Sequence, residues 1–314
     1  MTVIGDALLD TFVECVPQKL CTEGPVPVVW RGREVSVPGG AANVAANLAS
    51  LGAAVTLAGV TGRDPAGERL RFGLAELGVG LDALLPEPSC RTHHKMRILA
   101  DGHYVVRVDE GDARDRSGRL RPVVRAALAG ADLVVLSDYG LGVLDERLIG
   151  LVAAISRDRP DVPVVVDAKR PARFRRLRPT AITPNLDEAV TLAGARDRPE
   201  RLARRVRRAT DADLVALTLG ADGAYLLDRS GRGELVRARP GQAASEVGAG
   251  DSFVAALALG LAVQAPPQAA ALVAVEAAGI AVAKPYTAVV TASELVRSLA
   301  LLGASDRNQL VAVV

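Results

Sequence analysis

The four residues Gly248-Ala249-Gly250-Asp251 combine a backbone that a ligand can approach closely with a single acidic side chain. An Ala- and Leu-rich run with helical spacing follows, so these residues stand at the predicted start of a helix. The N–H groups at a helix start can bind phosphate and the negative charge that develops on it. A carboxylate there would repel phosphate, so its presence indicates a chemical role. That role would be to accept the proton of an attacking hydroxyl. The residues alone leave a simpler interpretation open, in which Asp251 only caps the helix.

A second glycine-rich turn, Pro38-Gly39-Gly40, lies near the N-terminus and leads into another segment with helical spacing. Small residues there would let a sugar approach the backbone. The amide of Asn43, one helical turn further on, can both donate to and accept from hydroxyl groups. Glycine pairs before helices are common, so this turn is weak evidence by itself.

In this order and at this separation, the two glycine-rich segments resemble the two signatures of the PfkB (ribokinase-like) sugar kinases. The resemblance extends along the chain to about residue 298. It implies a kinase that uses ATP and Mg²⁺ to phosphorylate a sugar hydroxyl. Asp251 would be the general base, and the amides of Gly248, Ala249 and Gly250 would stabilise the transferring phosphoryl group.

Two further segments resemble the nucleotide side of this family. Residues 183–188 are similar to its Asn-x-x-Glu element, which implies that Asn185 and Glu188 organise Mg²⁺, through water, beside the phosphates. Residues 218–223 are similar to its nucleotide-binding turn, which implies ATP contacts at Thr218, Gly220 and Gly223.

Within the family, the chain resembles the D-glycero-β-D-manno-heptose-7-phosphate 1-kinases, for example in Lys95-x-Arg97, Ser137-Asp138-Tyr139 and Asp167-x-Lys169. Basic residues suit a sugar that already carries a phosphate, because they provide charge-assisted hydrogen bonds to it. Each could instead be an exposed charge on a strand face. The substrate-binding residues that the resemblance implies are Asp6, Asp10, Gly39, Gly40, Asn43, Lys95, Arg97, Arg107, Asp138 and Lys169.

The chain departs from the family pattern at two positions that bear on specificity. Ser245 stands six positions before Asp251, where an aspartate that helps to hold a monovalent cation is usual, so we expect little dependence on potassium. Leu141 stands where the heptose kinases usually carry lysine. The exact sugar therefore stays open, and a kinase for another sugar phosphate or a non-catalytic sugar- or nucleotide-binding relative are the alternatives.

The elements that must position these residues follow an alternating pattern. Val-rich apolar runs alternate with helical segments, which predicts repeated βαβ units. Hydrophobic residues make up 49% of the chain but aromatic residues only 3%, which favours a core of Ala, Val and Leu around buried parallel strands. We expect an α/β fold, with a doubly wound and mostly parallel sheet covered by helices on both faces. One kinase domain would span residues 1–300, followed by a tail at 301–314.

Residues 25–37 and 95–109 break this pattern, because they predict short alternating strands around turns at Arg31-Gly32 and Asp101-Gly102. A small antiparallel sheet of this kind exposes a face and an edge unless it covers something. We therefore expect a lid over the active site that also makes a homodimer contact. An ordinary edge hairpin is the alternative.

The charge balance excludes several classes of partner. With 38 basic and 36 acidic residues the formal net charge is +2, which gives no reason to expect nucleic acid or an anionic membrane as a partner. The arginine-rich stretch at 195–210 is interpreted as the solvated face of a helix. We expect neither a signal peptide nor a membrane span, and hence a cytoplasmic protein.

Overall fold

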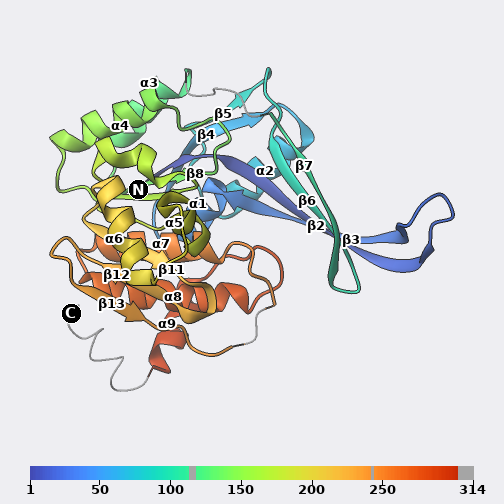
Figure 1. The fold of residues 1–314 in the computed structure, drawn as a ribbon. Helices are drawn as coiled ribbons and strands as arrows, with labels where there is room; N and C mark the ends of the chain where they lie inside the picture. The colour runs from blue at the N-terminus through green and yellow to red at the C-terminus, as the bar shows by residue number, and fades with distance from the viewer. Residues whose placement is uncertain (113–117, 242–243, 303–314) are drawn as a thin grey trace.

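The structure, a computed structural model, describes residues 1–112, 118–241 and 244–302. Its main sheet has nine strands in the order β13-β12-β11-β10-β9-β8-β1-β4-β5 (Figure 1). All neighbours pair in parallel except β11 with β12 and β12 with β13. The strands are β1 (Thr2–Gly5), β4 (Thr56–Gly62), β5 (Leu84–Glu87), β8 (Val134–Asp138), β9 (Val164–Ala168), β10 (Ala181–Ile182), β11 (Leu214–Thr218), β12 (Ala224–Leu227) and β13 (Gly233–Val236).

Helices cover both faces of this sheet, which confirms the predicted doubly wound fold. One buried cluster joins the sheet to α1 (Ala41–Ser50), α2 (Pro65–Glu76), α7 (Ala249–Ala262), α8 (Pro267–Val282) and α9 (Ala292–Ala300). The cluster on the other face joins it to α3 (Leu120–Ala129), α4 (Glu146–Asp158), the 3₁₀ helix η1 (Pro171–Leu177), α5 (Leu186–Ala193) and α6 (Pro199–Thr210).

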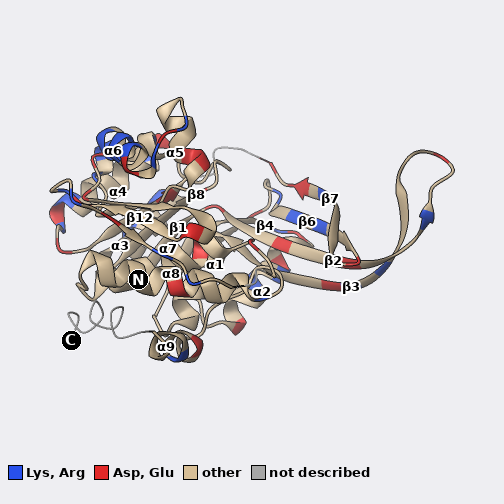
Figure 2. Ribbon diagram, turned by 60° about the horizontal axis from the view of Figure 1, so that its bottom comes forward, with Lys and Arg blue, Asp and Glu red and all other residues tan. Residues whose placement is uncertain are grey.

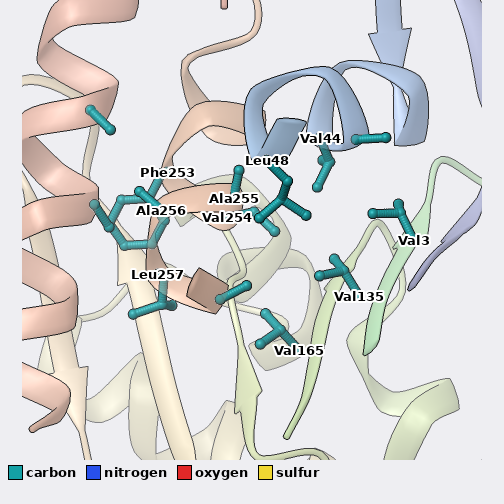
Figure 3. Close-up of a cluster of buried hydrophobic side chains, with 14 of the residues drawn as sticks. Val3, Val44, Leu48, Val135, Val165, Phe253, Val254, Ala255, Ala256 and Leu257 are labelled. Atoms are coloured by element: carbon teal, nitrogen blue, oxygen red, sulfur yellow. The ribbon is translucent and has the colours of Figure 1, made fainter. Parts of the chain in front are cut away.

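Small and branched aliphatic side chains fill the core, as the composition predicts. Successive strand residues point to opposite faces, so Val3 belongs to one cluster and Ile4 to the other. Helix α7 is apolar on nearly every side because it packs between α1 and α8 (Figure 3). Its N-terminus is thereby fixed beside the carboxyl ends of the parallel strands.

A second, four-stranded sheet projects from the main body, in the order β3-β2-β6-β7 (Figure 1). We call it the lid. Its strands are β2 (Ala7–Leu20), β3 (Pro27–Gly40), β6 (His93–Ala100) and β7 (His103–Glu110). The β2–β3 and β6–β7 pairs are antiparallel, whereas β2 and β6 pair in parallel.

The predicted lid was incomplete and wrong in one detail. Strand β2 was missed, and β3 runs through the predicted turn at Arg31-Gly32 without a break. Gly32 lies where the β2–β3 register shifts, and a Cβ atom there would lie 2.8 Å from the carbonyl oxygen of Glu14, so the glycine serves close strand pairing. The turn at Asp101-Gly102 is present, with φ of 48° and 77°.

The predicted tail begins just after α9, and its residues 303–314 lie outside the described part of the chain. Among the described residues, every helix is too short or too polar to cross a membrane.

Candidate active site

Asp251 lies in the first turn of α7, whose start depends on Gly248. That glycine has φ of +85°, and a Cβ atom on it would lie 2.6 Å from Cγ2 of Thr287 and 2.9 Å from Nδ2 of Asn43. A side chain is therefore excluded by both conformation and space. The Asp251 carboxyl group is buried and lines a cavity of about 110 Å³, together with Gly248 and Gly250.

Two side chains hold the carboxylate of Asp251 in place. Nδ2 of Asn43 donates to Oδ2 at 2.7 Å, and the hydroxyl of Tyr139 donates to Oδ1 at 2.8 Å. Burial raises the pKa of Asp251 to about 6, although both hydrogen bonds favour the charged form and lower it. A carboxylate with a pKa near neutrality suits the role of a general base.

Asn43 is held in turn by a buried chain of amides. Its Oδ1 accepts from Nδ2 of Asn47 at 3.1 Å, and Oδ1 of Asn47 accepts from the hydroxyl of Ser252 and from N–H of Val290, both at 3.0 Å. Both polar atoms of the Asn43 side chain are therefore engaged with protein groups. The structure thus adds a contact with Asp251 to the role of Asn43, and its predicted sugar contact stays a prediction. Asn47 was missed, although its i, i+4 spacing from Asn43 puts the two on one helical face.

Asp6 and Asp138, both predicted to bind substrate, shape the loop that carries Tyr139. The Asp6 carboxylate accepts from N–H of Tyr139 at 2.9 Å, Leu141 at 3.0 Å and Val143 at 3.1 Å. Asp138 accepts from N–H of Gly140 at 2.9 Å and pairs with a guanidinium nitrogen of Arg173 at 2.8 Å. Both aspartates are almost fully buried. Their carboxylates bind protein groups and so position the site, and the predicted substrate contacts of both residues stay predictions.

Asn185 and Glu188 lie at the start of α5, where they form a capping box. They line the same cavity as Asp251, and so does Thr218 at the carboxyl end of β11. The structure therefore brings these three predicted nucleotide-side residues together. Gly220 and Gly223 follow in the turn after β11 with φ of +60° and +95°, and a Cβ atom on Gly223 would lie 2.1 Å from the carbonyl oxygen of Val236.

Lys169 connects the acidic groups of this cavity. Its Nζ lies 2.8 Å from Oε1 of Glu188 and 5.4 Å from the ring centroid of Tyr139. Asp167, which sequence analysis did not assign to the site, also lines the cavity; burial and then the charges of Glu188 and Asp251 raise its pKa to about 7. Three carboxyl groups and one lysine therefore line this cavity, but no three acidic, His or Cys side chains in the described part of the chain are grouped closely enough to hold a metal ion directly.

On the other side of Asp251 lies the lid. Asp10 of β2 is buried and ion-paired with Arg97 of β6. Gly39 of β3 pairs with Leu8, and a Cβ atom on it would lie 2.2 Å from Oδ2 of Asp10. Its missing side chain therefore makes room for this carboxylate. Nζ of Lys95 lies 5.4 Å from the ring centroid of Tyr139, so Lys95 approaches the same tyrosine as Lys169.

Gly40 makes the sharp entry from β3 into α1. Its φ is +57°, and a Cβ atom on it would lie 2.7 Å from the carbonyl oxygen of Asp6. The two glycines of this turn thus serve close packing of the protein around Asp10 and Asp6, next to the predicted sugar site.

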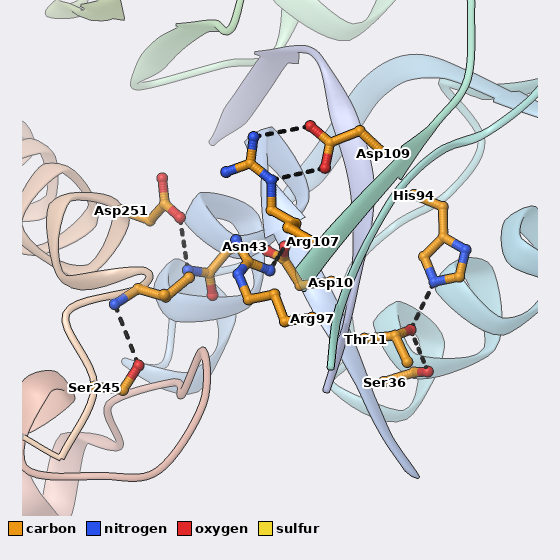
Figure 4. Close-up of polar contacts among 11 residues, drawn as sticks. Asp10, Thr11, Ser36, Asn43, His94, Arg97, Arg107, Asp109, Ser245 and Asp251 are labelled. Carbon is orange, nitrogen blue, oxygen red and sulfur yellow. Dashed lines mark hydrogen bonds and ion pairs between the residues drawn. The ribbon is translucent and has the colours of Figure 1, made fainter. Parts of the chain in front are cut away.

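A second cavity, of about 600 Å³, separates the lid from the segment that leads to α7. Arg97 and Arg107 line it from the lid, and Ser245 lines it from the opposite side. Nε and Nη2 of Arg107 bind the two carboxylate oxygens of Asp109 at 2.8 and 2.9 Å (Figure 4). The structure therefore gathers two of the predicted phosphate-binding residues at one cavity near Asp251.

The model of the pfkB family of carbohydrate kinases matches residues 2–293. The chain belongs to this family. Family membership makes the protein an ATP-dependent carbohydrate kinase, as the glycine-rich segments and Asp251 predict. It also places the two cavities within a kinase fold.

Curated relatives carry the name bifunctional protein HldE. The relative from Azorhizobium caulinodans is 37% identical over 304 residues, which cover 94% of this chain and 63% of the relative. The relative from Caulobacter vibrioides is 38% identical, over 93% of this chain and 62% of its own length. The chain thus spans less than two thirds of the length of these proteins.

Solved structures share the fold at low sequence identity. Ribokinase from Arabidopsis thaliana, complexed with ribose and ATP, superposes with a TM-score of 0.77 at 21% identity, covering 95% of this chain and 97% of its own. Phosphofructokinase-2 from Escherichia coli, in complex with substrates and products, gives a TM-score of 0.78 at 22% identity, covering 96% and 98%. The expected ribokinase-like fold is confirmed.

Proposed function

We propose that this kinase phosphorylates a hydroxyl group of a sugar phosphate, namely the anomeric hydroxyl of D-glycero-D-manno-heptose 7-phosphate, to give the 1,7-bisphosphate. The observation that carries the proposal is the oriented carboxylate of Asp251, which lines a polar cavity beside β11. An arginine-lined cavity under the lid adds a place for a phosphate on the sugar. The likeness to the heptose kinases in sequence, together with relatives named HldE, selects the sugar.

In the proposed reaction, the sugar hydroxyl oxygen attacks the γ-phosphorus of ATP. Asp251 accepts the hydroxyl proton while the new O–P bond forms, and the bond to the bridging oxygen breaks to leave ADP. The amides of Gly248, Ala249 and Gly250 at the start of α7 stabilise the charge on the transferring group. Asn43 and Tyr139 keep the carboxylate aimed, because each occupies one of its oxygens with a hydrogen bond.

On the nucleotide side, ATP would lie along the turn formed by Thr218, Gly220 and Gly223, with its phosphates toward Lys169. Magnesium, when bound, would offset the phosphate charge, and Asn185 and Glu188 would hold it through water. Asp167 lines the same cavity. Lys169 would then contact phosphate on the nucleotide side, a change from its predicted contact with the sugar.

On the sugar side, Asp10 and Lys95 would bind hydroxyl groups beside Tyr139. The phosphate already on the sugar would lie in the cavity under the lid, where Arg97 and Arg107 provide positive charge. Arg97 is also the partner of Asp10, so one guanidinium would couple the two parts of the sugar site. With ATP as the co-substrate, we place the reaction in the cytoplasm.

The test is ATP turnover by the purified protein with a panel of sugar phosphates and the corresponding unphosphorylated sugars. The proposal predicts the highest kcat/KM for the heptose 7-phosphate and formation of a bisphosphate. A preference for a hexose or ketose phosphate would support the kinase activity but change the substrate. Leu141, in place of the usual lysine, makes such a substrate the nearest alternative. ADP formation with none of the sugars would contradict the proposal.

A further inference from the structure

A third cavity lies beside the amino-terminal end of β11, whereas Asp251 lies beside the carboxyl ends of the parallel strands. It is formed by η1, the C-terminal end of α6, the residues that lead into β11, and the turn after β12. Strand β11 begins beside it at Leu214 and ends at Thr218 in the candidate active site. Its volume is about 400 Å³, within the range of small-molecule sites. The residues that line it are Arg175, Arg207, Arg208, Asp211, Ala212 and Arg229.

The charge around this cavity is strongly positive. Asp211 already pairs with Arg178 outside the lining, at 3.0 Å, and Arg229 pairs with Asp213 at 3.0 Å. Five arginines and two aspartates therefore meet here, which leaves a surplus of three positive charges on a protein whose formal net charge is only +2. Figure 2 shows the Lys and Arg positions gathered along α6.

Capping of a helix end explains part of this cluster. Arg175 donates to the carbonyl oxygen of Arg208 in the last turn of α6, where cations offset the negative end of the helix. That end amounts to only about half an elementary charge, so it does not require four arginines. Nη1 of Arg207 donates to the carbonyl oxygen of Arg229 at 2.8 Å. Each guanidinium has five N–H donors, so these single bonds fix the side chains without using up their donors.

We propose that this cavity binds the diphosphate or triphosphate group of a small molecule. Planar guanidinium groups bind phosphate oxygens in pairs, and several arginines at one cavity suit a ligand with more than one phosphate. The surplus of three charges is close to the charge of a diphosphate group at neutral pH. Inorganic pyrophosphate and the phosphate tail of a nucleotide share this chemistry. The proposal concerns a site separate from the transfer reaction and does not depend on which sugar the enzyme uses.

The experiment is a calorimetric titration of the purified full-length protein with inorganic pyrophosphate, in Mg²⁺-free buffer that contains no phosphate. The pocket variant carries Arg207→Gln and Arg208→Gln. The matched control carries Arg201→Gln and Arg204→Gln, which remove two charges from the same helix but do not line the cavity. Any pyrophosphate bound at the active site is common to all three proteins, and circular dichroism with thermal unfolding verifies that each is folded.

We expect the wild type to show a saturable binding event that the pocket variant weakens about 10-fold or more, because charge-assisted hydrogen bonds are worth about 1.5–3 kcal/mol each. The control should weaken pyrophosphate binding less than about 2-fold, since charges outside the cavity act only through screened long-range attraction. Equal losses in both variants, or binding that the pocket variant retains in full, would overturn the proposal. Titration with ADP then assigns the source: a larger loss for ADP than for pyrophosphate in the pocket variant supports a nucleotide, and equal losses support the diphosphate group alone.

Discussion

At the scale of single residues, the site depends on the two hydrogen bonds that the Asp251 carboxylate accepts. Asn43 and Tyr139 come from segments 208 and 112 residues away, and each donates to a different oxygen. Asp251 itself could be predicted from its local sequence, because the glycines and the following helix are contiguous with it. The role of Tyr139 could not, because it depends on a loop that Asp6 folds through three backbone hydrogen bonds.

Removing the hydroxyl of Tyr139 should change the pH dependence of the reaction. Burial holds the pKa of Asp251 at about 6, so activity should fall as the pH drops through about 6 and the base becomes protonated. The hydrogen bond from Tyr139 favours the charged carboxylate and lowers this pKa. In Tyr139→Phe the pKa should therefore rise, and the acidic limb of the kcat/KM profile should move to higher pH.

The measurement is the pH–rate profile of the wild type, of Tyr139→Phe and of the control Tyr225→Phe. Tyr225 belongs to β12 and does not contact Asp251. A shift of roughly one pH unit is expected, since a hydrogen bond to a charged group is worth about 1.5 kcal/mol and one pKa unit equals about 1.4 kcal/mol. An acidic limb at the same pH in all three proteins would show that Tyr139 does not tune the base.

At the scale of secondary-structure elements, the start of α7 is the most constrained position. Gly248→Ala would force a side chain into a left-handed backbone conformation and against Asn43 and Thr287. We expect a loss of about 1–2 kcal/mol in the free energy of unfolding from the backbone alone, and a fall in kcat because Asn43 is displaced from Asp251.

Chemical denaturation and steady-state kinetics check this prediction. Gly250→Ala is the control for stability, because an added Cβ atom there has no heavy atom within 4 Å. The control should be at least as stable as the wild type, because alanine favours a helix more than glycine does. If Gly248→Ala were as stable and as active as the wild type, the close packing at the start of α7 would matter neither for stability nor for catalysis.

The lid allows a separate test of the sugar site. Arg107→Gln should raise KM for the sugar phosphate about 10-fold or more, because it removes a charge-assisted hydrogen bond, while KM for ATP should change less than about 2-fold. Arg97 is a poor probe, since its removal would leave Asp10 buried without its partner. Arg33→Gln, an exposed lid substitution outside the cavity, is the control. Equal effects of Arg107→Gln on both substrates would remove Arg107 from the sugar site.

The alternating apolar runs predicted the parallel sheet and its helices, because period and composition are local properties. The lid was harder to predict. Residues 7–20 are buried in their first half and exposed at their end, so no single hydrophobic periodicity runs through β2. Gly32 has the composition of a turn but lies in a strand, since its neighbour across the sheet, at Glu14, leaves no room for a side chain. Contacts between distant segments decide both cases.

At the scale of the whole molecule, the lid leaves a large apolar surface uncovered. Its exposed hydrophobic side chains outside the cavity at Arg97 and Arg107 are Val16, Leu20, Val26, Trp30 and Val108. Exposed hydrophobic side chains concentrated on one projecting sheet favour an interaction site, and we propose that a second copy of the chain covers them. Trp30, 70% exposed, is the largest of these side chains.

Trp30→Glu should therefore shift the protein from dimer to monomer in sedimentation velocity experiments at micromolar concentration, because dimerisation would bury the new charge. Val296→Glu on α9, at a residue 66% exposed and outside the lid, should leave the dimer intact. A wild-type protein that sediments as a monomer, or a Trp30→Glu dimer as stable as the wild type, would contradict a dimer through the lid.

The most direct test of the account is the kcat of Asp251→Asn with the sugar phosphate that the panel selects. Asparagine is close to aspartate in size and can still accept hydrogen bonds through its amide oxygen, so the fold and the affinity for ATP should be nearly unchanged. It cannot accept the hydroxyl proton, and general-base catalysis is worth about 10²- to 10⁴-fold. We predict that kcat falls within that range while the dissociation constant of ATP changes little. A folded variant that phosphorylates its sugar at nearly the wild-type rate would show that Asp251 is not the base.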